Sequence, residues 1–291
     1  MKITIKAIFL FNPVLGYMSK MKAIKTFRDL LSFLTIIPLG NSEDFVETSA
    51  EAIYLFPLIG TFIGLLGAAY FLACNFLMSH LFAFINNVLL YVPAEFLTKL
   101  VPAVMTLAFL LVLTGLQHFD GLVDLGNAVG LGNAEERRAA AHAWTVTYKG
   151  AVLAIFVEFM AVLGLFFLNA DFAFKAVIAA EIVAKLAMVT IARFGKPTHK
   201  GLGSRFLDKA KRKRTIVAYL IAVLVVFPLF GFTTLGLIIS AGIIVVSVIL
   251  GVLMGLVSKS VFGGVSGDAI GATNEIVRAA TLVFAAGVLM L

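Results

Sequence analysis

Long apolar runs alternate with short polar segments along most of this chain. Seven runs are long enough, or nearly so, to cross the roughly 30 Å hydrocarbon core of a bilayer as helices. They cover about residues 52–78, 100–117, 150–168, 172–191, 216–232, 235–257 and 276–291. The pattern therefore predicts an all-α, polytopic integral membrane protein with about seven transmembrane helices.

Two further apolar segments are interrupted by polar residues. Charged residues break the segment 27–39, and paired asparagines and a proline break the segment 81–97. We expect both to lie at the membrane surface or to re-enter it rather than to cross it. The preceding residues 1–26 read as an N-terminal extension that is dispensable, with Met18 or Met21 as an alternative start. Residues 27–291 then form a single transmembrane domain.

Composition strengthens the membrane assignment. Hydrophobic residues make up 61% of the 291 positions, charged residues 13%, and the mean hydropathy is +1.06. These values lie outside the range of soluble globular domains. Cys74, the single cysteine, falls in the first apolar run. The chain therefore cannot form an intrachain disulfide or a cysteine-rich metal site.

The basic residues are distributed unevenly between the two ends of the predicted helices. Lys99 and Lys175 lie at one end and Lys185 lies within a run, whereas the other 20 of the 23 lysines and arginines lie toward the opposite end. Those 20 occur in or beside four segments: the N-terminal segment, residues 118–149, residues 194–214, and residues 259–275 with the helix entry at Arg278.

The positive-inside rule makes this basic face cytoplasmic, with the N-terminus inside and the C-terminus outside the cell (inner or plasma) membrane. The net charge of +7 then reflects topology and contact with anionic lipids of the bilayer. Nucleic-acid binding is not expected, because the basic run "DKAKRKR" adjoins a predicted crossing helix and lacks an aromatic platform or a recognisable module.

The segment "HFDGLVDLGN" (118–127) places two carboxylates and a histidine where an apolar run ends. On a helix, the i, i+4 spacing of Asp120 and Asp124 puts both carboxylates on one face, one turn apart. Mg²⁺ is commonly bound by one or two carboxylates together with the oxygens of a substrate diphosphate. The alternative is that both acids are solvated residues at a helix end.

The same loop also carries cations. Arg137, Arg138 and Lys149 follow the two aspartates, so groups for metal and for phosphate share one stretch, as phosphoryl transfer requires. His118 could act as a base, as a group that orients a metal ligand, or as an interfacial polar residue. We treat His118, Asp120 and Asp124 as the catalytic candidates.

Two glycine-rich loops contribute further candidates. The segment "GKPTHKGLGSRF" (195–206) combines glycines with Lys196 and Lys200, a composition suited to phosphate although it is not a P-loop. The segment "FGGVSGDAIGATNE" (262–275) holds Asp268, which is the third candidate metal ligand. This second loop could equally be a connector.

A charged pair occurs inside the fourth apolar run. Glu181 and Lys185 are spaced i, i+4, and either one alone would cost a few kcal/mol at the centre of a bilayer. They could form a structural ion pair. Lys185 also lies about two turns from the predicted cytoplasmic end, so it could instead reach a buried phosphate.

Taken in order, five segments resemble the cobalamin synthase family, also called adenosylcobinamide-GDP ribazoletransferases. They are "FLTIIPL" (33–39), "FPLIGTFIG" (56–64), "TGLQHFDGLVDLGNAVG" (114–130), "KGLGSRF" (200–206) and "GGVSGDAIGATNE" (263–275), the last being the most specific. The resemblance covers nearly the whole chain from about residue 28. One departure is Asn127, which stands where the family commonly has a third aspartate and which offers a carbonyl oxygen without charge.

The resemblance implies a catalytic domain that completes the nucleotide loop of vitamin B12. A hydroxyl of α-ribazole, or of its 5′-phosphate, attacks the phosphorus attached to adenosylcobinamide, and GMP leaves. Mg²⁺ is the implied cofactor, held by Asp120 and Asp124 with Asp268 or Asn127. Arg137, Arg138, Lys185, Lys196 and Lys200 are the candidate phosphate contacts, and the oligomeric state stays open.

Two other classes compete with this interpretation. Intramembrane acids and a lysine would suit an ion-coupled transporter, although the polar residues gather in loops on one face rather than near the midplane. A lipid phosphotransferase of the CDP-alcohol type also uses an Asp-Gly motif, but its pattern requires Ala-Arg soon afterwards. Here Val123 and Asp124 stand in that place, so the pattern fails.

Overall fold

The structure is a computed structural model that describes residues 13–88, 93–141, 143, 145–198 and 201–290. Within these residues the backbone is helical, and the one strand-like pairing is an isolated bridge between Pro197 and Val265. The helices are α1 (Pro13–Leu34), α2 (Phe45–Glu51), α3 (Phe56–Val88), α4 (Ala94–Leu113), α5 (Gln117–Ala128), α6 (Ala134–Ala141), α7 (Tyr148–Phe166), α8 (Ala170–Phe194), α9 (Leu202–Ala210), α10 (Ile216–Phe230), α11 (Thr234–Phe262) and α12 (Gly267–Met290). Short 3₁₀ turns, η2 (Ile53–Leu55) and η3 (Lys213–Thr215), precede α3 and α10. The predicted all-α class is confirmed.

Six of the described helices are long and apolar enough to cross a membrane: α3, α4, α7, α10, α11 and α12, with η2 and η3 extending two of them. Each coincides with a run predicted from sequence. The remaining predicted run forms α8, whose 25 residues extend over roughly 37 Å. Because α8 carries several charged residues, it is not counted among these six apolar helices. The chain is thus a multi-pass membrane protein.

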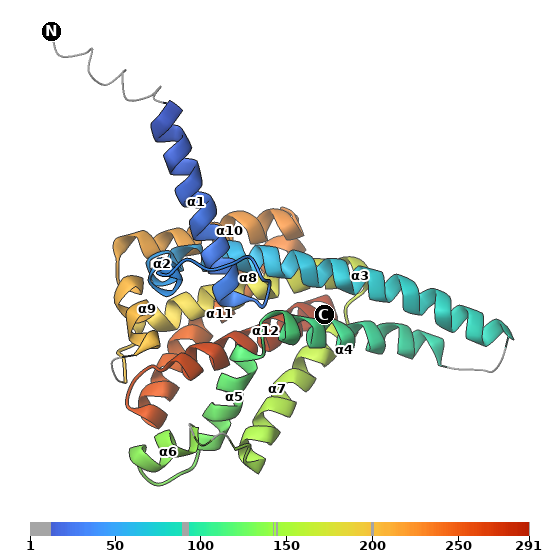
Figure 1. Cartoon of the computed structure of the whole chain (residues 1–291). Coiled ribbons are helices and arrows are strands. Elements are labelled where there is room, and N and C mark those ends of the chain that lie inside the picture. Colours follow the sequence, from blue (N-terminus) through green and yellow to red (C-terminus); the bar gives the residue numbers. More distant parts are fainter. Residues whose placement is uncertain (1–12, 89–92, 142, 144, 199–200, 291) are drawn as a thin grey trace.

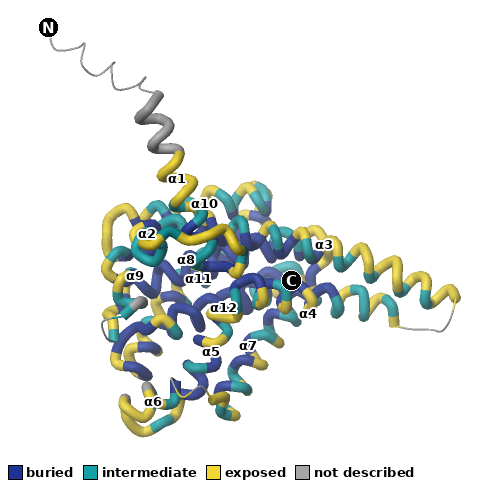
Figure 2. Tube along the Cα trace, in the orientation of Figure 1, coloured by how far each residue is buried: buried dark blue, intermediate teal, exposed yellow. Residues whose placement is uncertain are grey.

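Helix α8 occupies the centre of the bundle (Figure 1). It packs against α3, α10, α11 and α12, and every residue from Ala176 to Ala192 is buried. Figure 2 shows the same contrast along the chain, with buried positions concentrated in α8 and α12 and exposed ones in the outer helices. The charged residues at the middle of α8 are therefore shielded from lipid by the other helices.

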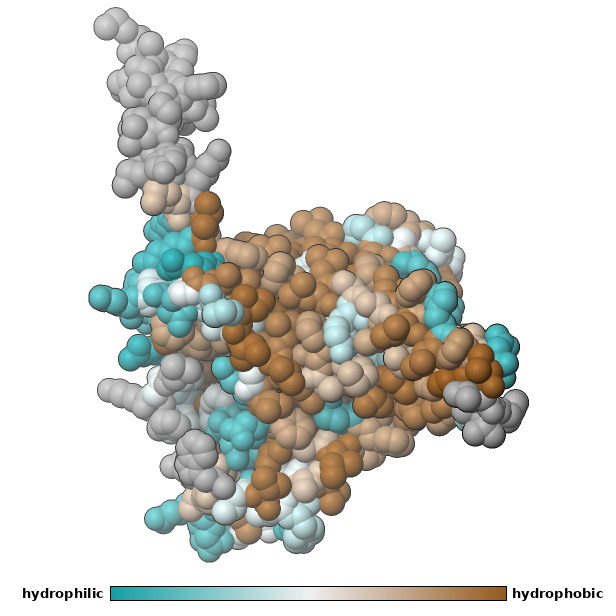
Figure 3. All heavy atoms as spheres, turned by 45° about the vertical axis from the view of Figure 1, so that its right-hand side comes forward, coloured by the Kyte–Doolittle hydropathy of each residue, from teal (hydrophilic) through white to brown (hydrophobic). Residues whose placement is uncertain are grey.

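The outer surface is apolar over a broad face of the molecule. Figure 3 shows hydrophobic atoms covering its middle, between more hydrophilic patches at two ends. Large apolar side chains lie exposed on the outer helices, for example Phe76 on α3, Ile155 on α7, Leu224 on α10 and Ile249 on α11. Such continuous apolar exposure is expected where lipid, rather than water, is the surrounding solvent.

Side-chain caps define where several long helices begin. Thr147 accepts a hydrogen bond from the backbone N–H of Gly150 at the start of α7, and Asn169 accepts one from Phe172 at the start of α8. Thr233 does the same for α11. Threonine and asparagine are favoured at this position because their side-chain oxygens satisfy an otherwise unpaired helix donor.

The prediction for residues 81–97 is wrong where the structure describes them. Instead of forming a separate surface segment, residues 81–88 continue α3, and Ala94 begins α4. Helix α3 is 33 residues long, or roughly 50 Å, so it exceeds the roughly 30 Å of hydrocarbon that the shorter predicted run 52–78 would fill. The hairpin of α3 and α4 projects to the right in Figure 1.

Helix α1 runs across the predicted boundary between the N-terminal extension and the domain at residues 26 and 27. Its C-terminal half packs into the bundle through Leu30, Leu31 and Leu34. The buried carboxylate of Asp29 accepts a hydrogen bond from the hydroxyl of Ser42 at 2.6 Å and fixes the following loop. Residues 1–12 lie outside the described part, and the dispensability of 1–26 stays a prediction.

Close backbone contact joins α3 to the central helix. A Cβ atom added to Gly64 would lie 2.7 Å from the Cα of Ile178, which is well inside van der Waals contact. Small residues at such positions allow membrane helices to approach and gain packing energy that lipid cannot supply. The close packing of α3 on α8 therefore depends on glycine, which has no side chain, at position 64.

We expect Gly64→Ala to lower the free energy of unfolding by about 1–3 kcal/mol, because the added methyl group overpacks the interface of α3 and α8. Thermal unfolding in detergent micelles measures the effect. Gly287→Ala on α12 is the matched control, since a Cβ atom there meets nothing within 4 Å. Equal stabilities of the two variants would contradict the packing argument.

Candidate active site

The polar loops predicted to share a face lie together at one end of the bundle. Two of them form the parallel bridge: the N–H of Val265 donates to the carbonyl of Lys196 at 2.7 Å, and the N–H of Thr198 donates to the carbonyl of Val265 at 3.3 Å. A third contact comes from Arg137, whose guanidinium donates to the carbonyl of Ser260 at the end of α11. The loops after α5, α8 and α11 therefore form one surface.

A sharp turn carries the chain from α4 into α5. Gly115 and Leu116 both adopt left-handed backbone conformations, with φ of 65° and 60°. Leu116 is the one described non-glycine residue with positive φ, a conformation that is costly for a branched side chain. The turn starts α5 at Gln117, so His118, Asp120 and Asp124 lie on one helix, as their spacing predicts.

The third candidate acid lies on a neighbouring helix. Asp268 is in the first turn of α12, where the partial positive charge of the helix end favours a carboxylate. The Ser266 hydroxyl caps that turn by accepting from the N–H of Ala269. A Cβ atom added to Gly121 would lie 2.9 Å from the Cα of Asp268, so α5 and α12 touch between the two aspartates of α5.

The donor chemistry of this region fits Mg²⁺, which the resemblance implies. Asp120 is exposed and Asp124 is half-buried, and they stand one turn apart on α5 with Asp268 across the contact. Hard carboxylate oxygens of this kind suit a cation that retains waters and also binds phosphate oxygens. In the described part of the chain, no three side chains among His, Cys, Asp and Glu lie close enough together to hold a metal ion, so the three aspartates offer donors rather than a formed site.

Asn127 has a different set of contacts. Its amide nitrogen donates to the carbonyl of Thr145 at 2.9 Å, and its oxygen accepts from both the N–H and the hydroxyl of Thr147, at 2.9 and 2.8 Å. Both lone pairs of that oxygen are in use. Asn127 therefore holds the loop that starts α7, and metal binding by it would require the release of Thr147.

The residues predicted to contact phosphate differ in their surroundings. Arg137 uses its donors on the backbone carbonyls of Leu131, Gly132 and Ser260, so it braces the loops. Lys196 is exposed beside the bridge with Val265. The side chain of Arg138 and the whole of Lys200 lie outside the described part.

Lys185 is not brought to this surface. It is fully buried, and its ammonium group donates to Glu181 at 2.7 Å. The structural ion pair is thus the arrangement observed, in place of the predicted phosphate contact.

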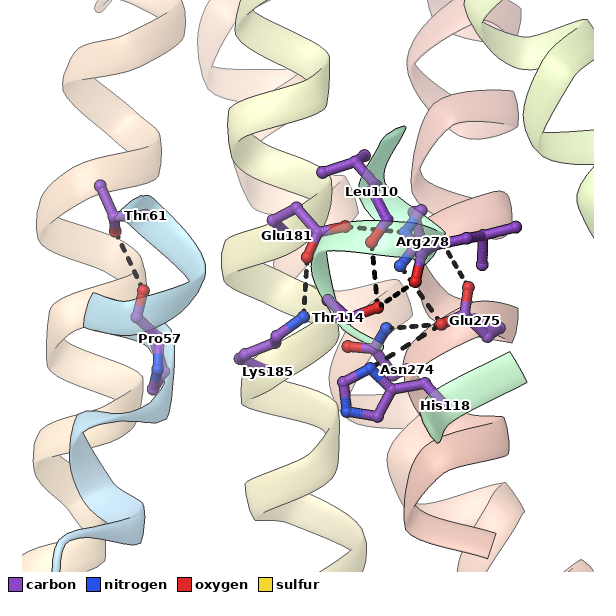
Figure 4. Close-up of polar contacts among 11 residues, drawn as sticks. Pro57, Thr61, Leu110, Thr114, His118, Glu181, Lys185, Asn274, Glu275 and Arg278 are labelled. Carbon is purple, nitrogen blue, oxygen red and sulfur yellow. Dashed lines mark hydrogen bonds and ion pairs between the residues drawn. The ribbon is translucent and has the colours of Figure 1, made fainter. Parts of the chain in front are cut away.

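A buried charge network lies beneath the loops (Figure 4). Arg278 of α12 donates to Glu181 of α8 at 2.7 Å and to both carboxylate oxygens of Glu275 one turn earlier. Asn274 donates to the same Glu275 carboxylate at 3.1 Å. Glu158 of α7 adds a third carboxylate, with both oxygens buried, that interacts electrostatically with Arg278. The network thereby joins α7, α8 and α12.

His118 links this network to the surface above it. The side chain is 5% exposed, and its Nδ1 atom lies 3.9 Å from a Glu275 carboxylate oxygen, beyond hydrogen-bond distance. Figure 4 shows that nitrogen turned toward Glu275 and the other directed away from the network. Burial, together with the positive charges of Lys185 and Arg278, lowers the pKa of His118 well below its ordinary value. The ring is therefore neutral at pH 7.

Glu275, Arg278 and Glu158 were not among the residues singled out from sequence. The signal that could have found them is the i, i+3 spacing of Glu275 and Arg278 in an otherwise apolar helix, since such charges must be paired in a membrane. Their partner Glu181 lies nearly a hundred residues away in the chain, so the spacing alone does not identify it.

A cavity of about 180 Å³ opens where His118 and Asp268 meet the end of the bundle. Residues from α1, η2, α3, α5, α8, α9 and α12 line it; the polar ones are Gln117, His118 and Asp268, and the apolar ones are Phe33, Leu34, Ile53, Phe56, Met188, Phe206 and Ile270. Because His118 and Asp268 line it, this cavity is the candidate substrate site.

Ion pairs to α2 fix helix α9, which contributes Phe206 to the cavity wall. The ammonium group of Lys209 lies 2.5 Å from Glu47 and 2.9 Å from Glu51. These carboxylates raise the pKa of Lys209, and hydrogen bonding to Lys209 lowers the pKa of Glu51. Each group therefore favours the docked position in its charged form.

The fold and the site together define a class: a polytopic helical membrane protein with carboxylates and cations at the end of its helices where a small cavity opens. A family model described as cobalamin-5-phosphate synthase matches residues 26–286. The chain belongs to this family, and with it to the membrane transferases of cobalamin biosynthesis.

Three named relatives are similar to the chain over most of its length and support the same family. The chain is 29% identical to the adenosylcobinamide-GDP ribazoletransferase of Methanosarcina barkeri, over 91% of this chain and 92% of the relative. It is 33% identical to the protein of the same name from Methanococcoides burtonii, over 86% and 88% of the two chains, and 32% identical to that of Methanocella arvoryzae, over 88% and 92%. No solved structure matches the chain.

Replacing Arg278 by methionine leaves the carboxylates of Glu181 and Glu275 without their shared cation. We expect the free energy of unfolding to fall by about 3–5 kcal/mol, as for other buried pairs that lose one partner. Thermal unfolding in detergent checks this. Lys175→Met is the control, because its pair with the exposed Asp171 is at the surface and should matter little. A loss no larger than that of the control would exclude a structural role for the network.

The docking of α9 should weaken in acid. Because the pKa of Glu51 is lowered in the folded protein, its contribution is present above the ordinary carboxylate pKa and is lost as the pH falls through the lowered value. Hydrogen-exchange protection of α9 amides such as Leu207 should therefore decrease as the pH falls below the ordinary carboxylate pKa of about 4.3. Lys209→Met should reduce protection already at pH 7, whereas Lys213→Met, at an exposed site, should not. Protection unaffected by Lys209→Met would refute the ion-pair argument.

Proposed function

We propose that this transferase joins α-ribazole, or its 5′-phosphate, to adenosylcobinamide-GDP. The hydroxyl oxygen of the ribazole forms a bond to the phosphorus that carries cobinamide, the bond from that phosphorus to the bridging oxygen of the diphosphate breaks, and GMP leaves. The hydroxyl loses its proton. The relatives' names support these substrates, and the observation that carries the proposal is the position of Asp268 in the cavity lining, on the helix that contacts α5 between Asp120 and Asp124.

Mg²⁺ is proposed as the cofactor. Asp120 and Asp124 would hold it, with Asp268 as the third candidate ligand and Asn127 as a ligand only after it releases its loop. When bound, the cation supplies Lewis-acid stabilisation of charge on the diphosphate oxygens. A diphosphate with a nucleotide leaving group needs such compensation, and carboxylate oxygens at this end of the bundle can provide it with a place to bind.

The remaining residues have roles that follow from their positions. His118 is the proposed acceptor of the hydroxyl proton, because it is the imidazole that lines the cavity. Lys196 and Lys200, with Arg138, are proposed to contact phosphate oxygens from the loops, while Arg137 braces those loops. The network of Arg278 and Glu275 supports α12 behind His118.

The proposed orientation puts this end of the bundle in the cytoplasm. The basic loops at residues 118–149, 194–214 and 259–275 support it through the positive-inside rule. The bilayer then surrounds the apolar helices, and both substrates would arrive from the aqueous side.

An ion-coupled transporter is the alternative, and the buried network is the observation that favours it. Glu181 and Lys185 lie inside the bundle, where a carrier would place coupling groups. However, Glu181 bonds to both Lys185 and Arg278 of α12, and the cavity opens at the end of the bundle next to Asp268. The family assignment also favours the transferase.

Asp120→Asn and Asp124→Asn should each reduce kcat for GMP release on the order of a hundred-fold, because each removes a charge that stabilises the reacting diphosphate. The assay uses purified protein in liposomes with adenosylcobinamide-GDP and α-ribazole, with and without Mg²⁺. Asp171→Asn, at the exposed start of α8, is the control and should retain activity. Wild-type turnover by folded Asp120→Asn would contradict the metal assignment, and no turnover by wild-type protein would contradict the function.

A further inference from the structure

Three aromatic side chains from separate elements form one wall of the cavity. Phe33 ends α1, Phe56 begins α3, and Phe206 lies on α9. The rings of Phe33 and Phe206 are stacked, with centroids 4.9 Å apart and planes inclined by 23°. Phe56 lies 5.9 Å from Phe206 and 6.5 Å from Phe33, so each ring contacts the other two. The charged loops nearby contain no comparable aromatic group among their described residues.

The cavity has the size of one aromatic ring system. A void of roughly 150 Å³ lined by apolar residues is large enough to hold benzene, whereas drug-sized ligands occupy roughly 300–1,000 Å³. At about 180 Å³, this cavity admits a small planar base but not a whole nucleotide or a corrin ring. The rest of any substrate must therefore extend out of it, past Asp268.

The lining favours a benzimidazole over guanine. Seven apolar side chains line the cavity, the three aromatic rings with Leu34, Ile53, Met188 and Ile270, beside three polar ones, Gln117, His118 and Asp268. Guanine carries a carbonyl, a ring N–H and an amino group around its edge, and those placed against the apolar side chains would lose their hydrogen bonds. A benzimidazole carries a single acceptor nitrogen on an otherwise apolar bicyclic ring, so it fits this lining with far less loss.

We propose that this aromatic cavity binds the benzimidazole base of α-ribazole, with Phe33, Phe56 and Phe206 as the residues that determine base specificity. The inference rests on the proposed function and names the position of one substrate within that site. The ribose then points toward Asp268 and His118, where the diphosphate is attacked. The guanine nucleotide binds elsewhere, outside the aromatic wall.

Competition with wild-type protein tests the proposal without any substitution. Free 5,6-dimethylbenzimidazole should inhibit GMP release competitively with α-ribazole, and it should leave the KM for adenosylcobinamide-GDP unchanged. Guanosine should not compete with α-ribazole. Competition by guanosine, or inhibition by the free base that α-ribazole cannot overcome, would overturn the assignment.

Phe206→Ala tests the wall directly. Loss of one stacking partner should raise the KM for α-ribazole about ten-fold or more, with little change in the KM for adenosylcobinamide-GDP, and should weaken inhibition by the free base in parallel. Phe109→Ala is the matched control, because Phe109 stacks on Tyr70 at 4.4 Å on helices α3 and α4, and neither residue lines the cavity. A merely structural role of Phe206 would change both KM values together.

The outcomes separate this inference from the function on which it rests. Turnover by wild-type protein together with an unchanged KM for α-ribazole in folded Phe206→Ala would refute the base site and leave the transferase function intact. No turnover by wild-type protein would refute the function itself. If Phe206→Ala does not fold, the competition experiment with wild-type protein still decides the matter.

Discussion

The constraint on which the rest of the structure depends is that charges inside a membrane bundle must be paired. Helix α8 carries Glu181 and Lys185 through the centre of the molecule, and α12 supplies Arg278 and Glu275. Lipid offers these groups no hydrogen bonds, so the helices must stay in register for every charge to keep a partner. This fixed register sets the position of α12 along the bundle axis, and therefore the position of Asp268 in its first turn.

Close backbone packing transmits that register to the neighbouring helices. Gly64 lets α3 lie directly on α8, and Gly121 lets α5 lie directly on α12. The three acids of the candidate metal site consequently belong to helices whose separation is set by contact rather than by flexible loops. A site that positions a diphosphate benefits from such rigidity, because small displacements of reacting groups reduce rates strongly.

Apolar periodicity and charge asymmetry predicted the helices and the shared face of the basic loops, because both follow from the solvent that surrounds each segment. The helical spacing of Asp120 and Asp124 was also readable from sequence, since it is local. The partnership of Arg278 with Glu181 and the aromatic wall around Phe206 were not, because each joins segments that are distant in the chain. The true length of α3 was missed because Asn86 and Asn87 interrupt the apolar pattern, although the helix continues through both of them.

Asn127 shows how one side chain can fix the conformation of a loop. Its amide nitrogen donates to Thr145 while its oxygen accepts twice from Thr147, so the side chain acts as donor and acceptor at once. An aspartate at this position would face the Thr145 carbonyl with a second oxygen and repel it. Asn127 and the loop that starts α7 are therefore interdependent, because a carboxylate in place of the amide requires a different conformation of the loop.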